Sequence, residues 1–140
     1  MKALIKIFDK HISEGEEACA ELTTTGTLDF NEKGFVITYN ETDEELFGCT
    51  TTLHVDGEER IAMTRSGTFN TDLIIEKERR HTCFYSTPYG ELIMGVYGKS
   101  IVSDMNENGG TLSFRYTLDF NSTPASENEL KITVAVKEEQ

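Results

Sequence analysis

The sequence predicts an all-β protein, an antiparallel up-and-down β-barrel of roughly nine or ten strands. Apolar residues alternate with polar ones in run after run of the chain, which is the period of a strand with one buried face. Gly, Asn, Asp and Pro separate these runs at short intervals, so successive strands are expected to form hairpins. No stretch keeps a helical period over the length that a helix needs. Closing the meander into a barrel removes its exposed edges, which favours a barrel over the alternative, a sandwich.

The N-terminal part begins with a predicted strand at residues 3–8, where Ala, Ile and Ile alternate with other side chains. Residues 18–28 are rich in Thr and form the next strand. Gly26 within them indicates a bulge or the close approach of another group. Residues 35–39 put Phe, Ile and Tyr on one face, and the acidic run at 40–45 is expected to be a solvated connection.

A hairpin is predicted next, because Asp56 and Gly57 form a strong turn signal between two alternating runs. Residues 47–55 and 59–66 are expected to pair across this turn. The alternation then continues through residues 69–77, which gives one more strand.

Residues 79–99 form the hairpin around which the other strands are arranged. Pro88 presets φ for a turn, and Gly90 can adopt the positive φ that closes a three-residue loop. This loop predicts pairing of Thr87 with Glu91. The same register sets Phe84 opposite Met94 and Ser86 opposite Leu92, with Val96 on the same apolar face. A two-residue loop would shift the register and exchange the partners.

The C-terminal part is predicted to hold three further strand segments, at residues 101–104, 112–120 and 130–136. Residues 112–120 show a clear amphipathic pattern, with Leu, Phe, Tyr, Leu and Phe on one face. Residues 106–110 and 121–128 are expected to be loops.

Length and charge limit the possible functions. The 140 residues fit a single domain, 1–140, with its own core. A formal net charge of −12 disfavours nucleic acid and membranes as partners, because both attract basic surfaces. Lys6 and Asp9 break the N-terminal apolar run too early for a signal peptide, so a cytoplasmic location is expected. The expected assembly is a monomer or a homodimer.

Three cysteines, Cys19, Cys49 and Cys83, are widely spaced along the chain. Neither a Cys-x-x-Cys pair nor a Cys/His cluster has the spacing of zinc ligands, so no metal or other cofactor is expected. The cysteines are interpreted as small, reduced core residues.

Several short motifs together resemble one family. They are residues 64–67 (TRSG), residues 85–92 (YSTPYGEL) and the run from Gly109 and Gly110 to Tyr116. In their order along nearly the whole chain they resemble the YwiB-like family of small bacterial proteins. This resemblance implies a calycin-like, that is lipocalin-like, β-barrel. It implies no reaction, ligand or catalytic residue.

Arg65 is the most informative residue for function. Its position in the alternation places it with Ile61 and Met63 on the apolar face, so its side chain is expected to point into the barrel. A buried guanidinium needs an anionic partner, either a carboxylate of the protein or a bound ligand. The alternative is that Arg65 lies at the rim and extends into water.

The favoured functional hypothesis is a non-enzymatic barrel that binds a small amphipathic or acidic molecule. The candidate ligand-binding residues are Arg65, His81, Tyr85, Tyr97 and Tyr116. One alternative is an interaction or structural module whose interior is filled by its own side chains. Another is a small hydrolase-type enzyme, although no Gly-x-Ser-x-Gly motif or other catalytic residue stands out.

Overall fold

The computed structural model describes residues 1–41, 48–67, 70–87, 90–120 and 123–137. Within these ranges the chain forms ten antiparallel strands. They are β1 (Lys2–Ser13), β2 (Glu16–Phe30), β3 (Phe35–Asn40), β4 (Thr50–Asp56), β5 (Arg60–Ser66), β6 (Asn70–Glu76), β7 (Arg80–Thr87), β8 (Gly90–Asn106), β9 (Gly109–Phe120) and β10 (Thr123–Val136).

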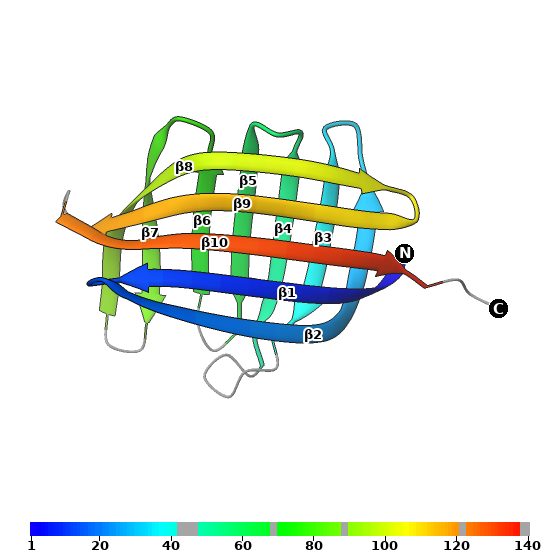
Figure 1. Ribbon diagram of the computed structural model, residues 1–140, viewed down its shortest axis with the longest axis horizontal. Coiled ribbons are helices and arrows are strands. Elements are labelled where there is room, and N and C mark those ends of the chain that lie inside the picture. The colour runs from blue at the N-terminus through cyan, green and yellow to red at the C-terminus, as the bar shows by residue number, and fades with distance from the viewer. Residues whose placement is uncertain (42–47, 68–69, 88–89, 121–122, 138–140) are drawn as a thin grey trace.

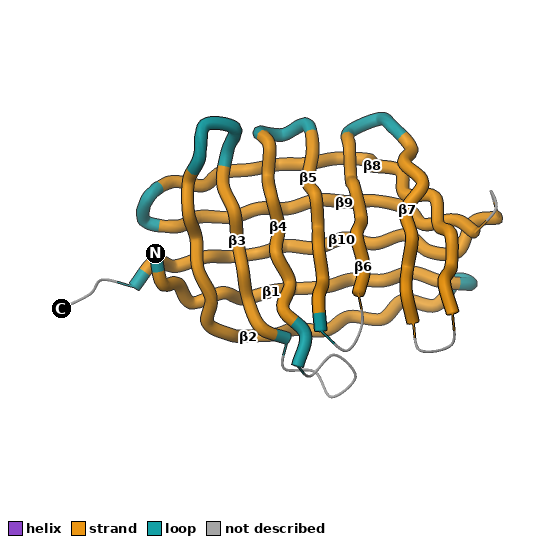
Figure 2. The backbone as a smooth tube through the Cα atoms, turned by 180° about the vertical axis from the view of Figure 1, so that it is seen from behind, coloured by secondary structure: helices purple, strands orange, loops and turns teal. Residues whose placement is uncertain are grey.

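The strands close into one barrel. Each strand pairs with the next along the chain, and β1 pairs with both β2 and β10. The long strands β1, β2, β9 and β10 and most of β8 cross the shorter strands β3 to β7 steeply, and the two sets face each other (Figures 1 and 2). The predicted up-and-down barrel is therefore confirmed. The sandwich alternative is wrong, because β1 pairs with β10 and so closes the sheet into a barrel.

The core lies between these two sets of strands. Side chains at every second position point inward, which fills most of the interior with Ile, Leu, Val and Phe. Phe114 is fully buried at the centre and stacks on Tyr116 with ring centroids 6.0 Å apart. Along β9 the predicted apolar face is buried as far as Tyr116, but Phe120 at its end is 40% exposed. The interior is thus solid in the middle and opens toward one end.

The loop that joins β7 and β8 is one residue shorter than predicted. Thr87 pairs with Gly90, so the connection has two residues, and the predicted pairing of Thr87 with Glu91 is wrong. Gly90 does have the expected positive φ, +128°, whereas residues 88–89 of the predicted loop lie outside the described ranges.

The shorter loop changes which side chains are inside. Cys83 is opposite Met94 and both are buried, whereas Phe84 pairs with Ile93 on the outer face. The predicted facing of Phe84 and Met94, and of Ser86 and Leu92, is therefore wrong. Because strand side chains alternate, one residue of slip moves every partner to the other face.

Several boundaries and one cysteine also differ from expectation. The expected loop at 121–128 is strand from Thr123 onward, because a bulge between Pro124 and Ser126 accommodates the proline. The strand predicted at 101–104 is the end of β8, which continues through a bulge between Gly98 and Ser100. Cys49 and Cys83 are buried as expected, but Cys19 is exposed, since it lies on the outer side of β2.

Gly26 shows the expected close approach. A Cβ built at this position would meet the carbonyl oxygen of Thr38 and the side chain of Ile5. The absence of a side chain lets β3 pass close to β2 at the point where their pairing begins.

Candidate functional site

Inward-facing positions become polar toward one end of the barrel. On β1 the inward series Ala3, Ile5 and Ile7 continues to Asp9, and after β3 the series Phe35, Ile37 and Tyr39 continues to Glu41. We call the resulting set the polar end; it consists of Asp9, Glu41, Thr51, Arg65, Thr71 and Tyr116.

Arg65 points into the barrel, as predicted, and is held by the protein itself. Its Nη2 lies 3.3 Å from Oε1 of Glu41, and its Nε donates to Oγ1 of Thr51 at 3.3 Å. The Thr51 hydroxyl in turn donates to the same Glu41 oxygen at 2.8 Å. The side chains of Arg65 and Glu41 are 23% and 7% exposed. Of the two partners expected for Arg65, the structure therefore supplies the protein carboxylate.

This result corrects one expectation for the acidic run at 40–45. Glu41 is buried rather than solvated, because it continues the inward series of β3 and meets Arg65. Residues 42–45 of that run lie outside the described ranges.

A cavity of about 350 Å³ adjoins this network. Its polar side is formed by Asp9, Arg65, Thr71 and Tyr116. Its apolar side comes from β5, β6, β8, β9 and β10, with the side chains of Met63, Leu73, Leu92, Met94, Leu118, Phe120 and Leu130. Leu92 and Phe120 at the rim are 48% and 40% exposed, so the cavity communicates with solvent.

The electrostatics of the polar end reflect its burial. Burial raises the pKa of Asp9, the charges of His11 and Arg65 act against that rise, and the charge of Glu41 adds to it. Burial also raises the pKa of Tyr116, with the nearby carboxylate of Asp9 as the second cause. Tyr116 is therefore a neutral hydroxyl at physiological pH.

The structure brings together two of the five candidate ligand-binding residues. Arg65 and Tyr116 line the same cavity. His81 lies near the other end of β6 and β7, where its Nε2 is 3.2 Å from Oε1 of Glu76. Tyr97 is 38% exposed and follows the buried Val96, so it faces outward.

The fifth candidate, Tyr85, pairs through its backbone with Thr71 and with Leu92, both of which line the cavity. Its side chain lies outside the described part of the structure, so its role stays a prediction.

Sequence reasoning missed Asp9, Glu41, Thr51 and Thr71. Each lies two residues from a buried apolar side chain of β1, β3, β4 or β6, so the period of two, continued to the strand ends and one step beyond β3, would have identified them. They were missed because a polar residue normally marks where a buried series stops.

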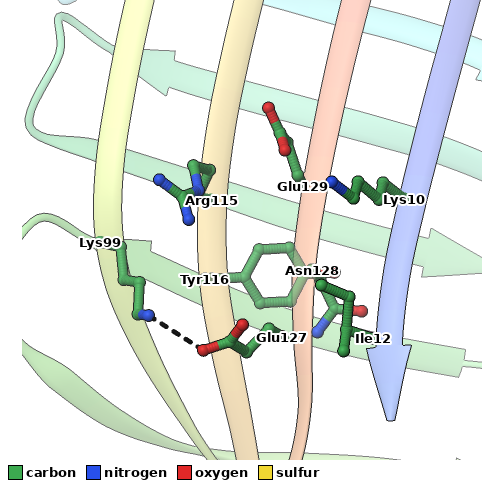
Figure 3. A pocket seen from close by; sticks show the side chains of 8 residues that line it. All are labelled: Lys10, Ile12, Lys99, Arg115, Tyr116, Glu127, Asn128 and Glu129. Atoms are coloured by element: carbon green, nitrogen blue, oxygen red, sulfur yellow. Dashed lines mark hydrogen bonds and ion pairs between the residues drawn. The ribbon is translucent and has the colours of Figure 1, made fainter. Parts of the chain in front are cut away.

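A smaller cavity of about 50 Å³ lies beside β8, β9, β10 and β1 (Figure 3). Two of the cations that line it are already paired. Lys99 lies 3.1 Å from Glu127, and Lys10 lies 3.2 Å from Glu17. Its volume is suited to about one or two water molecules, so it is no alternative to the cavity at the polar end.

A further hollow of about 470 Å³ runs along the ends of β1, β9 and β10. Consecutive residues 117–119 and 124–127 line it, and consecutive strand residues point to opposite faces. It is therefore a groove at the ends of these strands rather than part of the barrel interior.

Among the described residues, no group of three or more His, Cys, Asp or Glu side chains is arranged to hold a metal ion. The same part of the chain contains no helix long and apolar enough to cross a membrane.

Fold and site together define a small closed β-barrel with a ligand-sized cavity at one polar end. The chain belongs to the family described as "Domain of unknown function (DUF1934)", whose profile matches residues 5–132. It is also similar to the ywiB protein from Bacillus subtilis, known from a crystal structure. The TM-score is 0.84 and the identity 21%, over 98% of this chain and 92% of that one. The predicted YwiB-like family is thus confirmed, and at this identity the structural match shows the fold alone. No curated protein matches the chain.

Proposed function

We propose that this protein is a non-enzymatic, lipocalin-like barrel that binds one small amphipathic molecule in the cavity at the polar end. The observation that carries the proposal is a cavity of about 350 Å³ with one apolar and one polar side. Ligand pockets usually measure roughly 300–1,000 Å³ and combine apolar walls with a few polar groups.

The lining favours an amphipathic ligand over a purely acidic one. Arg65 already forms an ion pair with Glu41, so its charge does not call for a second anion. The apolar side, with Met63, Leu73 and Met94, suits a hydrocarbon tail, and each buried methylene contributes ~0.8 kcal/mol. A head group would lie against Asp9 and Thr71.

The same observation weighs against an interaction module with a filled interior, since such a module needs no cavity. The proposal places the barrel in the cytoplasm as a monomer or homodimer. The net charge of −12 supports a small molecule as the partner, rather than nucleic acid or a membrane.

Native mass spectrometry of protein purified from its own host tests the proposal. A retained small molecule with an apolar tail is the expected result, followed by its release on denaturation. Protein that binds neither a host molecule nor octan-1-ol in a thermal-shift titration would contradict the proposal.

Two neighbouring tryptophan substitutions localise the binding. Leu92 lines the cavity rim, whereas Ile93 faces outward and is 54% exposed. Leu92→Trp should weaken octan-1-ol binding about tenfold, the equivalent of ~1.4 kcal/mol. Ile93→Trp is the matched control, with the same added bulk on the outer face, and should leave binding unchanged. Equal effects of both variants would place the binding elsewhere.

A further inference from the structure

The charges at the polar end do not balance. Two carboxylates, those of Asp9 and Glu41, lie near one guanidinium, that of Arg65. Glu41 forms an ion pair with Arg65, with 3.3 Å between Oε1 and Nη2. Among the described residues none forms an ion pair with Asp9, although the charges of His11 and Arg65 favour its ionised form.

Asp9 also lacks hydrogen-bond donors. No described side chain or backbone group donates to its carboxylate, and its strand neighbours Ala20 and Leu130 have apolar side chains. His11, two residues along β1, has its Nδ1 2.8 Å from Oδ1 of Asn128, and its charge favours the ionised form of Asp9. A half-buried carboxylate without a protein donor can accept hydrogen bonds from a ligand.

Thr71 gives an independent sign of an incomplete site. The residue is only 6% exposed and lines the same cavity as Asp9, yet its buried hydroxyl has no hydrogen-bond partner. Buried hydroxyls are nearly always paired, so an unpaired one is an exception that calls for a partner. The cavity is thus lined by a carboxylate without a protein donor and by a threonine whose buried hydroxyl has no partner, beside an apolar wall.

We propose that the cavity selects amphipathic ligands whose head is a protonated amine, held by the carboxylate of Asp9 and the hydroxyl of Thr71. An ammonium group carries three donors and one positive charge, so it supplies both what Asp9 lacks and a donor to Thr71. This inference rests on the proposed function, because the tail of the ligand occupies the apolar side of the same cavity.

A carboxylate head is disfavoured by the same geometry. It would be the third anion beside Asp9 and Glu41, and the guanidinium of Arg65 is already bonded to Glu41 and Thr51. An alcohol head supplies a donor but no charge. The expected order of affinity is therefore amine, then alcohol, then carboxylate.

Three probes with one tail test this order. Octylamine, octan-1-ol and octanoate are titrated into the full-length protein at about pH 8, where an ordinary amine with a pKa of ~10.4 stays protonated. Octylamine should bind at least about tenfold more tightly than octan-1-ol, in line with a charge-assisted hydrogen bond. Octanoate should bind most weakly.

Variants distinguish the effect of Asp9 on amine binding from the effect of the overall negative charge of the chain. Asp9→Asn should reduce the ratio of octylamine affinity to octan-1-ol affinity about tenfold. Asp104→Asn is the matched control, since it removes one carboxylate from an exposed position of β8 that does not line the cavity. It should leave the ratio unchanged. Thr71→Val, which keeps the shape and removes the hydroxyl, should lower octylamine affinity severalfold.

Each outcome has a distinct meaning. If none of the probes binds, the proposed function fails together with this inference. If octan-1-ol and octanoate bind as tightly as octylamine, the cavity binds ligands but the amine preference is wrong. If Asp104→Asn lowers the ratio as much as Asp9→Asn does, the preference comes from overall charge, and the assignment to Asp9 is overturned.

Discussion

Replacing Arg65 by methionine tests the network that shapes the polar end. Methionine keeps the length and the apolar stem of the side chain but removes the cation that faces Glu41. The carboxylate of Glu41, with a side chain only 7% exposed, would retain the hydroxyl of Thr51 and lose its charged partner. The variant therefore leaves an uncompensated charge inside the barrel.

The size of the effect follows from the burial of the pair. Breaking a buried ion pair by removing one partner costs roughly 3–5 kcal/mol, whereas an exposed pair is worth less than about 1 kcal/mol. The Arg65 side chain is 23% exposed, so some water reaches the pair. We therefore expect a loss near the lower limit, ~3 kcal/mol in the free energy of unfolding at about pH 7.

Urea unfolding of a double-mutant cycle measures this loss. Glu41→Gln in the Arg65→Met background removes the stranded charge, so it should restore most of the stability that Arg65→Met takes away.

Two results would refute this reasoning. A loss below about 1 kcal/mol would mean that the pair behaves as a surface ion pair. A double variant no more stable than Arg65→Met would mean that the loss comes from packing rather than from the charge on Glu41.

Three further predictions concern the core and the titration of Asp9. Phe114→Ala should cost roughly 3–5 kcal/mol in urea unfolding, whereas Phe120→Ala at the cavity rim should cost about 1 kcal/mol or less; equal losses would contradict a barrel that is solid at its centre and open at one end. Gly26→Ala should cost roughly 1–3 kcal/mol, since its Cβ would meet the backbone of β3; a neutral effect would mean that the two strands are less tightly packed. Burial raises the pKa of Asp9 above the ordinary 3.8, so the folded protein holds this proton more tightly than the unfolded chain does, and its contribution to stability falls as pH rises through that window. Asp9→Asn should therefore gain stability relative to wild type as pH rises above about 4, and a relative loss would contradict the sign of the shift.

The fold could be predicted because its signal is local. Alternating apolar residues and short turns define strands and hairpins without knowledge of distant contacts, and a meander of hairpins closes into few architectures. The inward position of Arg65 followed from the same alternation, since it shares its face with Ile61 and Met63.

The register of the β7–β8 hairpin could not be predicted in the same way. Loops of two and of three residues both suit the turn residues around Gly90, and they differ only in which side chains meet. The structure buries the small Cys83 against Met94 and leaves Phe84 outside, a choice that depends on the space left by the other strands. Turn chemistry alone carries no information about that space.

For a related reason, the partner of Arg65 could not be predicted from the sequence. Glu41 lies 24 residues away in an acidic run, and nothing in the sequence indicates that it meets Arg65. Only the pairing of β3 with β4, and of β4 with β5, brings Glu41, Thr51 and Arg65 together. Extending the inward series of each strand by one step would have shown that Glu41 faces the interior.

Methionine methyl signals offer the most direct measurement of ligand binding in the cavity. The chain has four methionines, of which Met63 and Met94 line the cavity and Met1 and Met105 do not. In NMR spectra of protein with 13C-labelled methionine methyl groups, titration with octylamine should shift the signals of Met63 and Met94 and leave the other two in place. Shifts of all four signals alike, or of none at saturation, would contradict a ligand-binding cavity at the polar end.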